Sequence, residues 1–124
     1  MFATTPAFSG FSTDDVPAAR AFYADVLGLD VHEEAGMLFL DVHEGHPVLV
    51  YPKGDAHVPA TFTVLNFPVD NVEAAVRELA DRGVEFERYD GVDDLGIMRE
   101  GGPLIAWFTD PAGNILSVIE AGTP

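Results

Sequence analysis

Residues 107–120 consist of an apolar run, a tight turn and a second apolar run: Trp107-Phe108-Thr109-Asp110-Pro111-Ala112-Gly113-Asn114-Ile115-Leu116-Ser117-Val118-Ile119-Glu120. Asp110-Pro111 favours a turn because the proline fixes φ directly after a side chain that can accept hydrogen bonds. Gly113-Asn114 supplies two residues that tolerate positive φ before the chain returns. The stretch is therefore predicted to form a β-hairpin.

Upstream of this hairpin, the sequence predicts two helices that begin and end with the same kinds of residue. Asp15 precedes apolar residues spaced three and four apart that end at Gly28, and Asn71 precedes a similar pattern that ends at Gly83. Strands are predicted at 7–12, from 31 onward, and at 37–42, 47–52, 61–69 and 84–89, with a turn at 44–46 and an acidic loop at 90–95. The order is strand, helix and three strands, twice.

Such a repeat restricts the architecture. The two helix caps lie closer together than Gly45 and Gly113 do, so the second copy carries about twelve extra residues, which fit the loop at 90–95. One copy is too small to close a core alone. The sequence therefore predicts one α+β domain of two βαβββ modules, about 7–53 and about 60–122, that form a curved mixed sheet around a cavity with the helices outside.

Composition excludes several classes of function. Twenty-one acidic residues against six basic ones give a formal charge of −15, which opposes binding to DNA or RNA. No apolar run is long enough for a membrane span, and no basic residue precedes an apolar stretch at the N-terminus. The absence of cysteine removes disulfides and thiolate chemistry. We expect the protein to be cytoplasmic. Its length of 124 residues predicts a single domain.

Two motifs carry a resemblance to a known family. Residues 21–29 resemble the Phe-Tyr-x-x-x-Leu-Gly signature of the vicinal oxygen chelate superfamily, which includes glyoxalase I, extradiol dioxygenases and bleomycin-resistance proteins. Residues 110–114 resemble its Asp-Pro-x-Gly-Asn closing motif. The resemblance extends from about Phe8 to Glu120 and implies the fold described above. It leaves function open, because members include metal lyases, epimerases, dioxygenases, thiol transferases and metal-free drug-binding proteins.

The resemblance also implies where a metal would bind. Enzymes of this superfamily place four ligands, usually His, Gln or Glu, at matching strand positions, which correspond here to Phe8, Leu49, Val64 and Ser117. Three of these side chains are hydrocarbons and the fourth is a hydroxyl, so they do not suit a divalent ion. A shift by one residue gives no better ligands and turns each side chain to the opposite face. We expect no metal and no other cofactor at these positions.

Other polar residues offer weaker candidates. Asp41, His43 and His46 could form a weak, exposed metal site, but we interpret them as part of a solvated turn between strands. His32 and His57 have no companion at ligand spacing and are interpreted as surface residues. Asp93 and Asp94 with Arg99 could form a lid over the cavity, or could belong to a flexible acidic loop.

If the four positions that the resemblance implies for metal ligands face the cavity, alternation along the strands extends this set to a predicted lining. The candidate ligand-binding residues are Phe8, Leu49, Tyr51, Phe62, Val64, Asn66, Trp107 and Ser117. Such an apolar, aromatic surface with a few polar groups is typical of sites for planar or apolar molecules, but the same side chains could instead fill the space as core.

Three functions follow as hypotheses. The first is a metal-free protein, similar to the bleomycin-resistance proteins, that binds a small aromatic or cationic molecule. The second is a lyase, isomerase or dioxygenase-like enzyme with a displaced metal or none, and the third is a structural or regulatory partner with a filled cavity. The resemblance implies a homodimer, because relatives commonly pair, although two modules of one chain could also close as a monomer.

Overall fold

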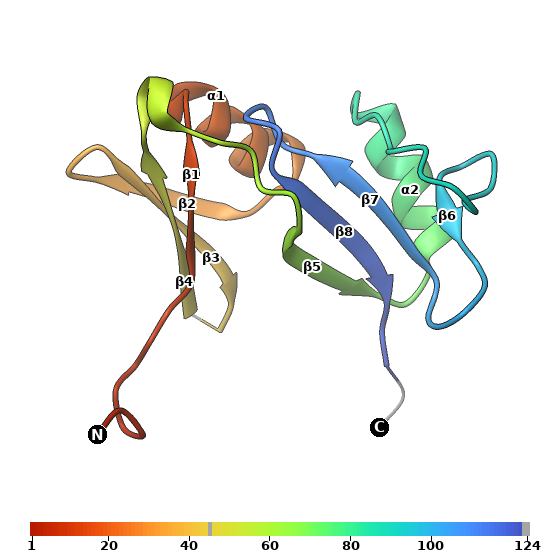
Figure 1. Cartoon of the computed structure of the whole chain (residues 1–124), viewed down its shortest axis with the longest axis horizontal. Helices are drawn as coiled ribbons and strands as arrows, with labels where there is room; N and C mark the ends of the chain where they lie inside the picture. Colours follow the sequence, from red (N-terminus) through yellow and green to blue (C-terminus); the bar gives the residue numbers. More distant parts are fainter. Residues whose placement is uncertain (45, 123–124) are drawn as a thin grey trace. The chain divides into compact units, whose positions relative to one another are not determined.

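The chain's structure, a computed structural model, describes residues 1–44 and 46–122. The elements follow the order β1-α1-β2-β3-β4 and then β5-α2-β6-β7-β8, with a π-helical segment η1 after α1 and a short 3-10 helix η2 after β4. They form two open, mixed, four-stranded sheets (Figure 1). This arrangement confirms the predicted α+β fold of two βαβββ repeats.

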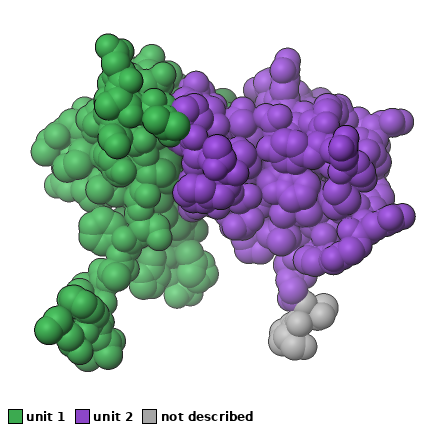
Figure 2. All heavy atoms as spheres, in the orientation of Figure 1, with its two compact units in different colours: residues 1–58 green, residues 59–124 purple. Residues whose placement is uncertain are grey.

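The chain divides into two compact units, Met1–Val58 and Pro59–Pro124, which are coloured separately in Figure 2. Within the described residues, none of the helices has the length and apolar character needed to cross a membrane. Each unit is described by itself below.

The first unit contains the sheet β1-β4-β3-β2, built from β1 (Gly10–Thr13), β2 (Asp30–Glu34), β3 (Met37–His43) and β4 (His46–Pro52). β1 runs parallel to β4, and the other neighbours are antiparallel. Helix α1 (Val16–Ala21) packs against β3 and β4, and η2 (Gly54–Ala56) follows the sheet. The core of this unit consists of buried apolar side chains, among them Phe11, Tyr23, Leu38, Leu40 and Val50.

The N-terminus of α1 is confirmed, but its later turns differ from the prediction. Asp15 caps the helix, with its Oδ1 accepting a hydrogen bond from the Ala18 amide at 3.0 Å. Regular α-helix ends at Ala21, and η1 (Phe22–Val26) continues as a wider π-helical turn. Tyr23 on this turn is completely buried and its ring lies 6.1 Å from that of Phe11. The apolar spacing predicted a helical segment but could not distinguish the two kinds of turn.

Two boundaries in this unit also differ from expectation. The first strand begins at Gly10 rather than at residue 7, and His46, expected in a turn, is the first residue of β4. Gly45, on which that turn and the comparison with Gly113 depend, lies outside the described residues.

The second unit contains the sheet β5-β8-β7-β6, built from β5 (Thr63–Val69), β6 (Ile97–Met98), β7 (Ile105–Thr109) and β8 (Ile115–Glu120). β5 runs parallel to β8, and the other neighbours are antiparallel. Helix α2 (Val72–Asp81) begins at Asn71, whose side chain accepts a hydrogen bond from the Ala74 amide at 3.0 Å. Capping by Asn71 is therefore confirmed, and α2 packs against β7 and β8 (Figure 1).

The strand predicted at 84–89 is wrong as a continuous element. Phe86 pairs with Phe108 of β7 through an isolated bridge, and the Glu87 amide donates to the Trp107 carbonyl at 2.8 Å. The pairing with β7 resumes only at Ile97, opposite Ala106. Residues 88–96 thus form an insertion that divides one strand position into two short pieces, and within it Val92 pairs with Met98 of β6 through a second isolated bridge.

The predicted hairpin between β7 and β8 is confirmed, but Asn114 does not supply a positive φ as expected. Gly113 has φ +83°, whereas Asn114 is not among the residues with positive φ. Asp110 Oδ1 accepts hydrogen bonds from the Ala112 and Asn114 amides at 3.0 and 2.9 Å, and Asn114 Nδ2 donates to Asp110 Oδ2 at 3.1 Å. Both side chains are buried, so they stabilise the turn from within.

In each unit the helix lies on one face of the sheet. Phe11 contacts Tyr23 of η1, and Phe108 contacts Phe86, which lines a cavity with residues of α2. Side chains of neighbouring residues in a strand point to opposite faces. Val50 and Phe108 face the helix, so Leu49 and Trp107, which precede them, lie on the face away from the helix. We call this the open face of each sheet.

Candidate functional site

The open face of the second sheet carries a row of three predicted residues. Asn66, Ser117 and Trp107 are register partners on the adjacent strands β5, β8 and β7. Ser117 Oγ donates a hydrogen bond to Asn66 Oδ1 at 2.6 Å, and Ser117 is completely buried. The structure therefore brings these three residues together, with the hydroxyl already bonded to the amide.

Tyr89 extends this row and was missed by the sequence analysis. Its ring centroid lies 5.4 Å from that of Trp107, with an angle of 57° between the ring planes. Burial, and then the charge of Glu87, raise the pKa of Tyr89 above its ordinary value of 10.0, so its phenol stays protonated at neutral pH. The alternation of residues along 84–89 could have indicated the side of the strand on which Tyr89 lies, because it places Tyr89 on the same face as Glu87.

The start of β5 breaks the alternation that predicted Phe62 and Val64. Thr63 pairs with Ile115 and Leu65 pairs with Leu116, so the register shifts between them and Val64 occupies a bulge. Phe62 precedes the strand and is 67% exposed. Thr63, rather than Val64, is the register partner of Ile115.

The open face of the first sheet contains Leu49 and Tyr51. Leu49 lies between Gly10 and Phe39, and Tyr51 pairs with Ser12. A Cβ on Gly10 would come within 3.2 Å of the Leu49 carbonyl oxygen, so a larger residue would crowd the strand pair. Phe8 precedes β1 and is 57% exposed. It lines a cavity of about 690 Å³ formed by residues 5–9, Val42 and residues 46–48.

Two histidines contribute to this face. His32 was predicted on the surface, and its side chain is 64% exposed, although its ring stacks on Phe39 at 5.2 Å with 9° between the planes. His57 was also predicted on the surface. It is half-buried, and its Nδ1 lies 2.7 Å from Ser12 Oγ. The contact spans 45 residues, so no local pattern could indicate it.

An acidic edge borders the stacked rings. Asp30 and Asp41 lie directly opposite each other on β2 and β3, next to the pair of His32 and Phe39. These four residues and Pro47 help to line a cavity of about 230 Å³. Like charges at directly opposed positions repel each other, so a cation at this edge is electrostatically favourable.

The residues at the family's metal positions do not fit a metal. Leu49 and Val64 offer no donor atom, Phe8 precedes the sheet, and the Ser117 hydroxyl is committed to Asn66. The register of β3 shifts between Asp41 and His43, so the regular alternation that would place both side chains on one face of the strand is interrupted. Among residues 1–44 and 46–122, no group of three or more His, Asp or Glu side chains is placed to hold a metal ion.

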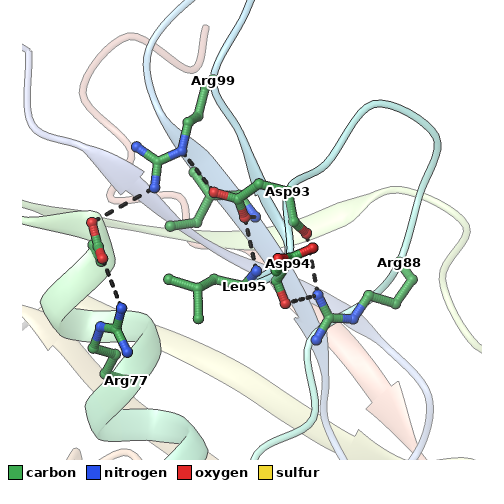
Figure 3. A network of polar contacts seen from close by, with 8 residues as sticks. Arg77, Arg88, Asp93, Asp94, Leu95 and Arg99 are labelled. Atoms are coloured by element: carbon green, nitrogen blue, oxygen red, sulfur yellow. Dashed lines mark hydrogen bonds and ion pairs between the residues drawn. The ribbon is translucent and has the colours of Figure 1, made fainter.

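The acidic loop is anchored to α2, as Figure 3 shows. Asp93 Oδ1 accepts hydrogen bonds from the Leu95 and Ile97 amides at 2.9 Å, and its Oδ2 lies 2.7 Å from Arg99 Nε. Arg99 also approaches Glu73 of α2 at 3.6 Å. These contacts join the loop to the start of β6 and, through Arg99, to α2.

These contacts shift the pKa values of three groups. Hydrogen bonds from the Ile97 amide and then from Arg99 lower the pKa of Asp93, and the hydrogen bond from Arg77 lowers the pKa of Glu73. The hydrogen bond to Asp93 raises the pKa of Arg99. All three groups are charged at neutral pH.

Known structures share this arrangement of elements. A glyoxalase family protein from Enterococcus faecalis is 22% identical, with a TM-score of 0.71 over 97% of this chain and 100% of its own. The antibiotic-binding protein TnmS3 from Streptomyces sp. CB03234 is 19% identical, with a TM-score of 0.67 over 94% and 96% of the two chains. Lactoylglutathione lyase from Agrobacterium tumefaciens is 23% identical, with a TM-score of 0.62 over 95% of each chain. At these identities the likeness shows the fold alone.

A comparison with curated protein sequences gave no match. The sequence matches a family model over residues 7–118, which is most of the chain and includes both repeats and the closing hairpin. The chain therefore belongs to the Glyoxalase/Bleomycin resistance protein/Dioxygenase superfamily.

Proposed function

We propose that this protein binds a small aromatic or cationic molecule in an apolar cavity, without a metal or other cofactor. The observation that carries the proposal is the pair formed by Ser117 and Asn66. Where metal-dependent relatives are expected to present a carboxylate, this chain presents a hydroxyl that already donates to an amide oxygen at 2.6 Å. The pair leaves a neutral polar patch beside Trp107.

The open faces support a planar or cationic ligand. Trp107 and Tyr89 form one aromatic surface, and Phe39 and His32 form another beside Asp30 and Asp41. Aromatic rings contact planar molecules favourably and attract cations to their faces. TnmS3, which shares the fold, is an antibiotic-binding protein, so the fold is compatible with this role.

The residues that we assign to ligand binding are those predicted from the sequence, on or near the open faces: Phe8, Leu49, Tyr51, Phe62, Val64, Asn66, Trp107 and Ser117. We also propose that the two repeats, about 7–53 and about 60–122, act as modules of one domain in a cytoplasmic homodimer. Sedimentation tests the assembly, and a solution mass equal to that of one chain would reject the dimer.

Trp107 is the only tryptophan, so its fluorescence reports directly on the open face. A panel of aromatic cations should raise the melting temperature, and each compound that does so should change the Trp107 emission with a saturable dependence on concentration. Ser117→Ala should weaken binding, whereas Glu100→Gln, at an exposed loop position, should leave it unchanged. A panel without a single stabilising compound would count against the proposal.

Enzymatic function is the second candidate, supported by the likeness to lactoylglutathione lyase. It would make the chain a lyase, isomerase or dioxygenase-like enzyme with a displaced metal or none. Elemental analysis of protein purified without a His-tag separates the candidates. Stoichiometric Ni, Zn, Fe or Mn would reject metal-free binding and favour the enzyme.

A further inference from the structure

A cavity of about 670 Å³ lies between α2 and the insertion at 88–96, within the second unit. Its lining combines residues of α2 with the segment that follows the helix: Val76, Arg77, Ala80, Asp81, Val84, Glu85, Phe86, Arg88 and Leu95. Pockets that hold drug-sized ligands measure roughly 300–1,000 Å³. The cavity is on the helix side of the sheet, so it is separate from the open face that carries Trp107 and Ser117.

The floor of this cavity is apolar. Val76 and Val84 are buried, and Phe86 and Leu95 are half-buried. Figure 3 shows the Leu95 side chain extending from the loop toward α2. An apolar ligand body of modest size would therefore remove hydrocarbon surface from water on both sides.

Arg88 supplies a positive charge at this cavity that is held in place by neutral partners. Its Nη1 donates to the backbone carbonyls of Asp93 and Asp94, whereas Arg77 is paired with Glu73 at 2.9 Å. Within the described part of the chain, no carboxylate lies within ion-pair distance of Arg88. Because a guanidinium binds a carboxylate through two parallel hydrogen bonds, Arg88 is suited to a carboxylate ligand.

The protein's negative charge does not preclude such a ligand. Two of the six basic residues, Arg77 and Arg88, line this cavity. Charges farther away than about 8 Å are largely screened at physiological ionic strength. Asp81 and Glu85 also line the cavity and repel a second negative charge, so a dianion such as phosphate is disfavoured.

We propose that this cavity binds a small monocarboxylate with an apolar body, with the carboxylate on Arg88 and the body on Val76, Val84, Phe86 and Leu95. The anchoring of the loop by Asp93 and Arg99 keeps the loop wall of the site in place. The inference concerns a second site and does not depend on the proposed function.

The test is a titration of the full-length, ¹⁵N-labelled protein with 3-phenylpropionate, followed by amide resonances. Saturable shifts should be confined to residues 76–95. Its neutral analogue 3-phenylpropanamide and its cationic analogue phenethylamine should bind at least about tenfold more weakly, because each lacks the charge that Arg88 recognises.

Two variants with matched controls locate the site. Arg88→Gln should weaken binding of 3-phenylpropionate at least about tenfold, whereas Arg82→Gln, which removes a charge outside the cavity lining, should not. Because Arg88→Gln also removes bonds to the loop, Ala80→Trp provides independent evidence. It fills the cavity from an exposed helix position and should abolish binding, whereas Ala74→Trp, at an exposed position outside the lining, should not.

Three results would overturn the inference. They are the absence of saturable shifts up to the solubility limit of the probe, equal binding of the neutral amide, and shifts centred on Trp107 and Ser117. The last result would place the ligand on the open face and would leave the proposed function standing.

Discussion

At the scale of single residues, Asp110 shows how a sequence motif combines a signal for a turn with a buried polar network. Asp110 is 4% exposed, and its carboxylate accepts hydrogen bonds from two backbone amides and the Asn114 side chain. Asn114 in turn accepts from the Ala60 amide at 3.1 Å. The motif therefore fastens the hairpin to the segment that precedes β5.

We expect Asp110→Asn to lower the free energy of unfolding by about 1–3 kcal/mol. The substitution keeps the shape but replaces an acceptor oxygen with an NH₂ group, which faces donors that remain buried. Urea denaturation followed by circular dichroism measures the effect. Asp90→Asn, in an exposed turn, is the matched control and should change stability little. Equal effects of the two substitutions would mean that the network contributes nothing.

At the scale of elements, the β7–β8 hairpin depends on a glycine for two reasons. Gly113 has φ +83°, and a Cβ there would lie 3.1 Å from Pro59 Cβ. Gly113→Ala should therefore cost about 1–3 kcal/mol of unfolding free energy, from backbone strain and crowding together. Gly102→Ala meets no atom within 4 Å and should be nearly neutral in the same denaturation experiment. A neutral Gly113→Ala would contradict the assigned turn geometry.

The insertion at 88–96 should respond to acid through Asp93. The pKa of Asp93 is lowered from its ordinary 3.8, chiefly by the hydrogen bond from the Ile97 amide. Its contribution to stability is therefore complete above that value and is lost as the pH falls through the lower pKa of the folded state. Below about pH 4, the wild type should lose more stability than Asp93→Asn.

Urea midpoints measured across the acidic range check this pH dependence. Asp94→Asn is the control, because the Asp94 carbonyl, and not its carboxylate, accepts the hydrogen bond from Arg88. The Asp94→Asn midpoints should follow the wild-type pH dependence. If Asp93→Asn follows it too, Asp93 does not anchor the loop.

At the scale of the whole molecule, the charge of −15 should make stability depend on salt. Excess like charge destabilises a compact state by self-repulsion, and added ions screen that repulsion. The melting temperature at pH 7 should therefore rise as NaCl is raised from low to physiological concentration. The rise should be smaller near about pH 4, where many carboxylates are protonated. An equal rise at both values would point to an effect unrelated to charge.

The sequence by itself determined the fold class, the two helix caps and the closing hairpin. Asp15, Asn71 and Asp110 act through hydrogen bonds to residues within four positions, so local patterns are sufficient to indicate them. The apolar periodicities that define the strands and helices are local in the same sense. Residue identity alone also showed that Phe8, Leu49 and Val64 have no side-chain atom that could bind a metal ion.

Only the tertiary structure decided what depends on pairing between distant strands. The insertion interrupts the strand beside β7, a bulge displaces Val64, His57 reaches Ser12, and Tyr89 meets Trp107. The cavity beside Arg88 lies between α2 and the insertion, in which Asp93 bonds to Arg99. Register and long-range contacts are set by how separate segments pack against each other, and this is why a local pattern cannot specify them.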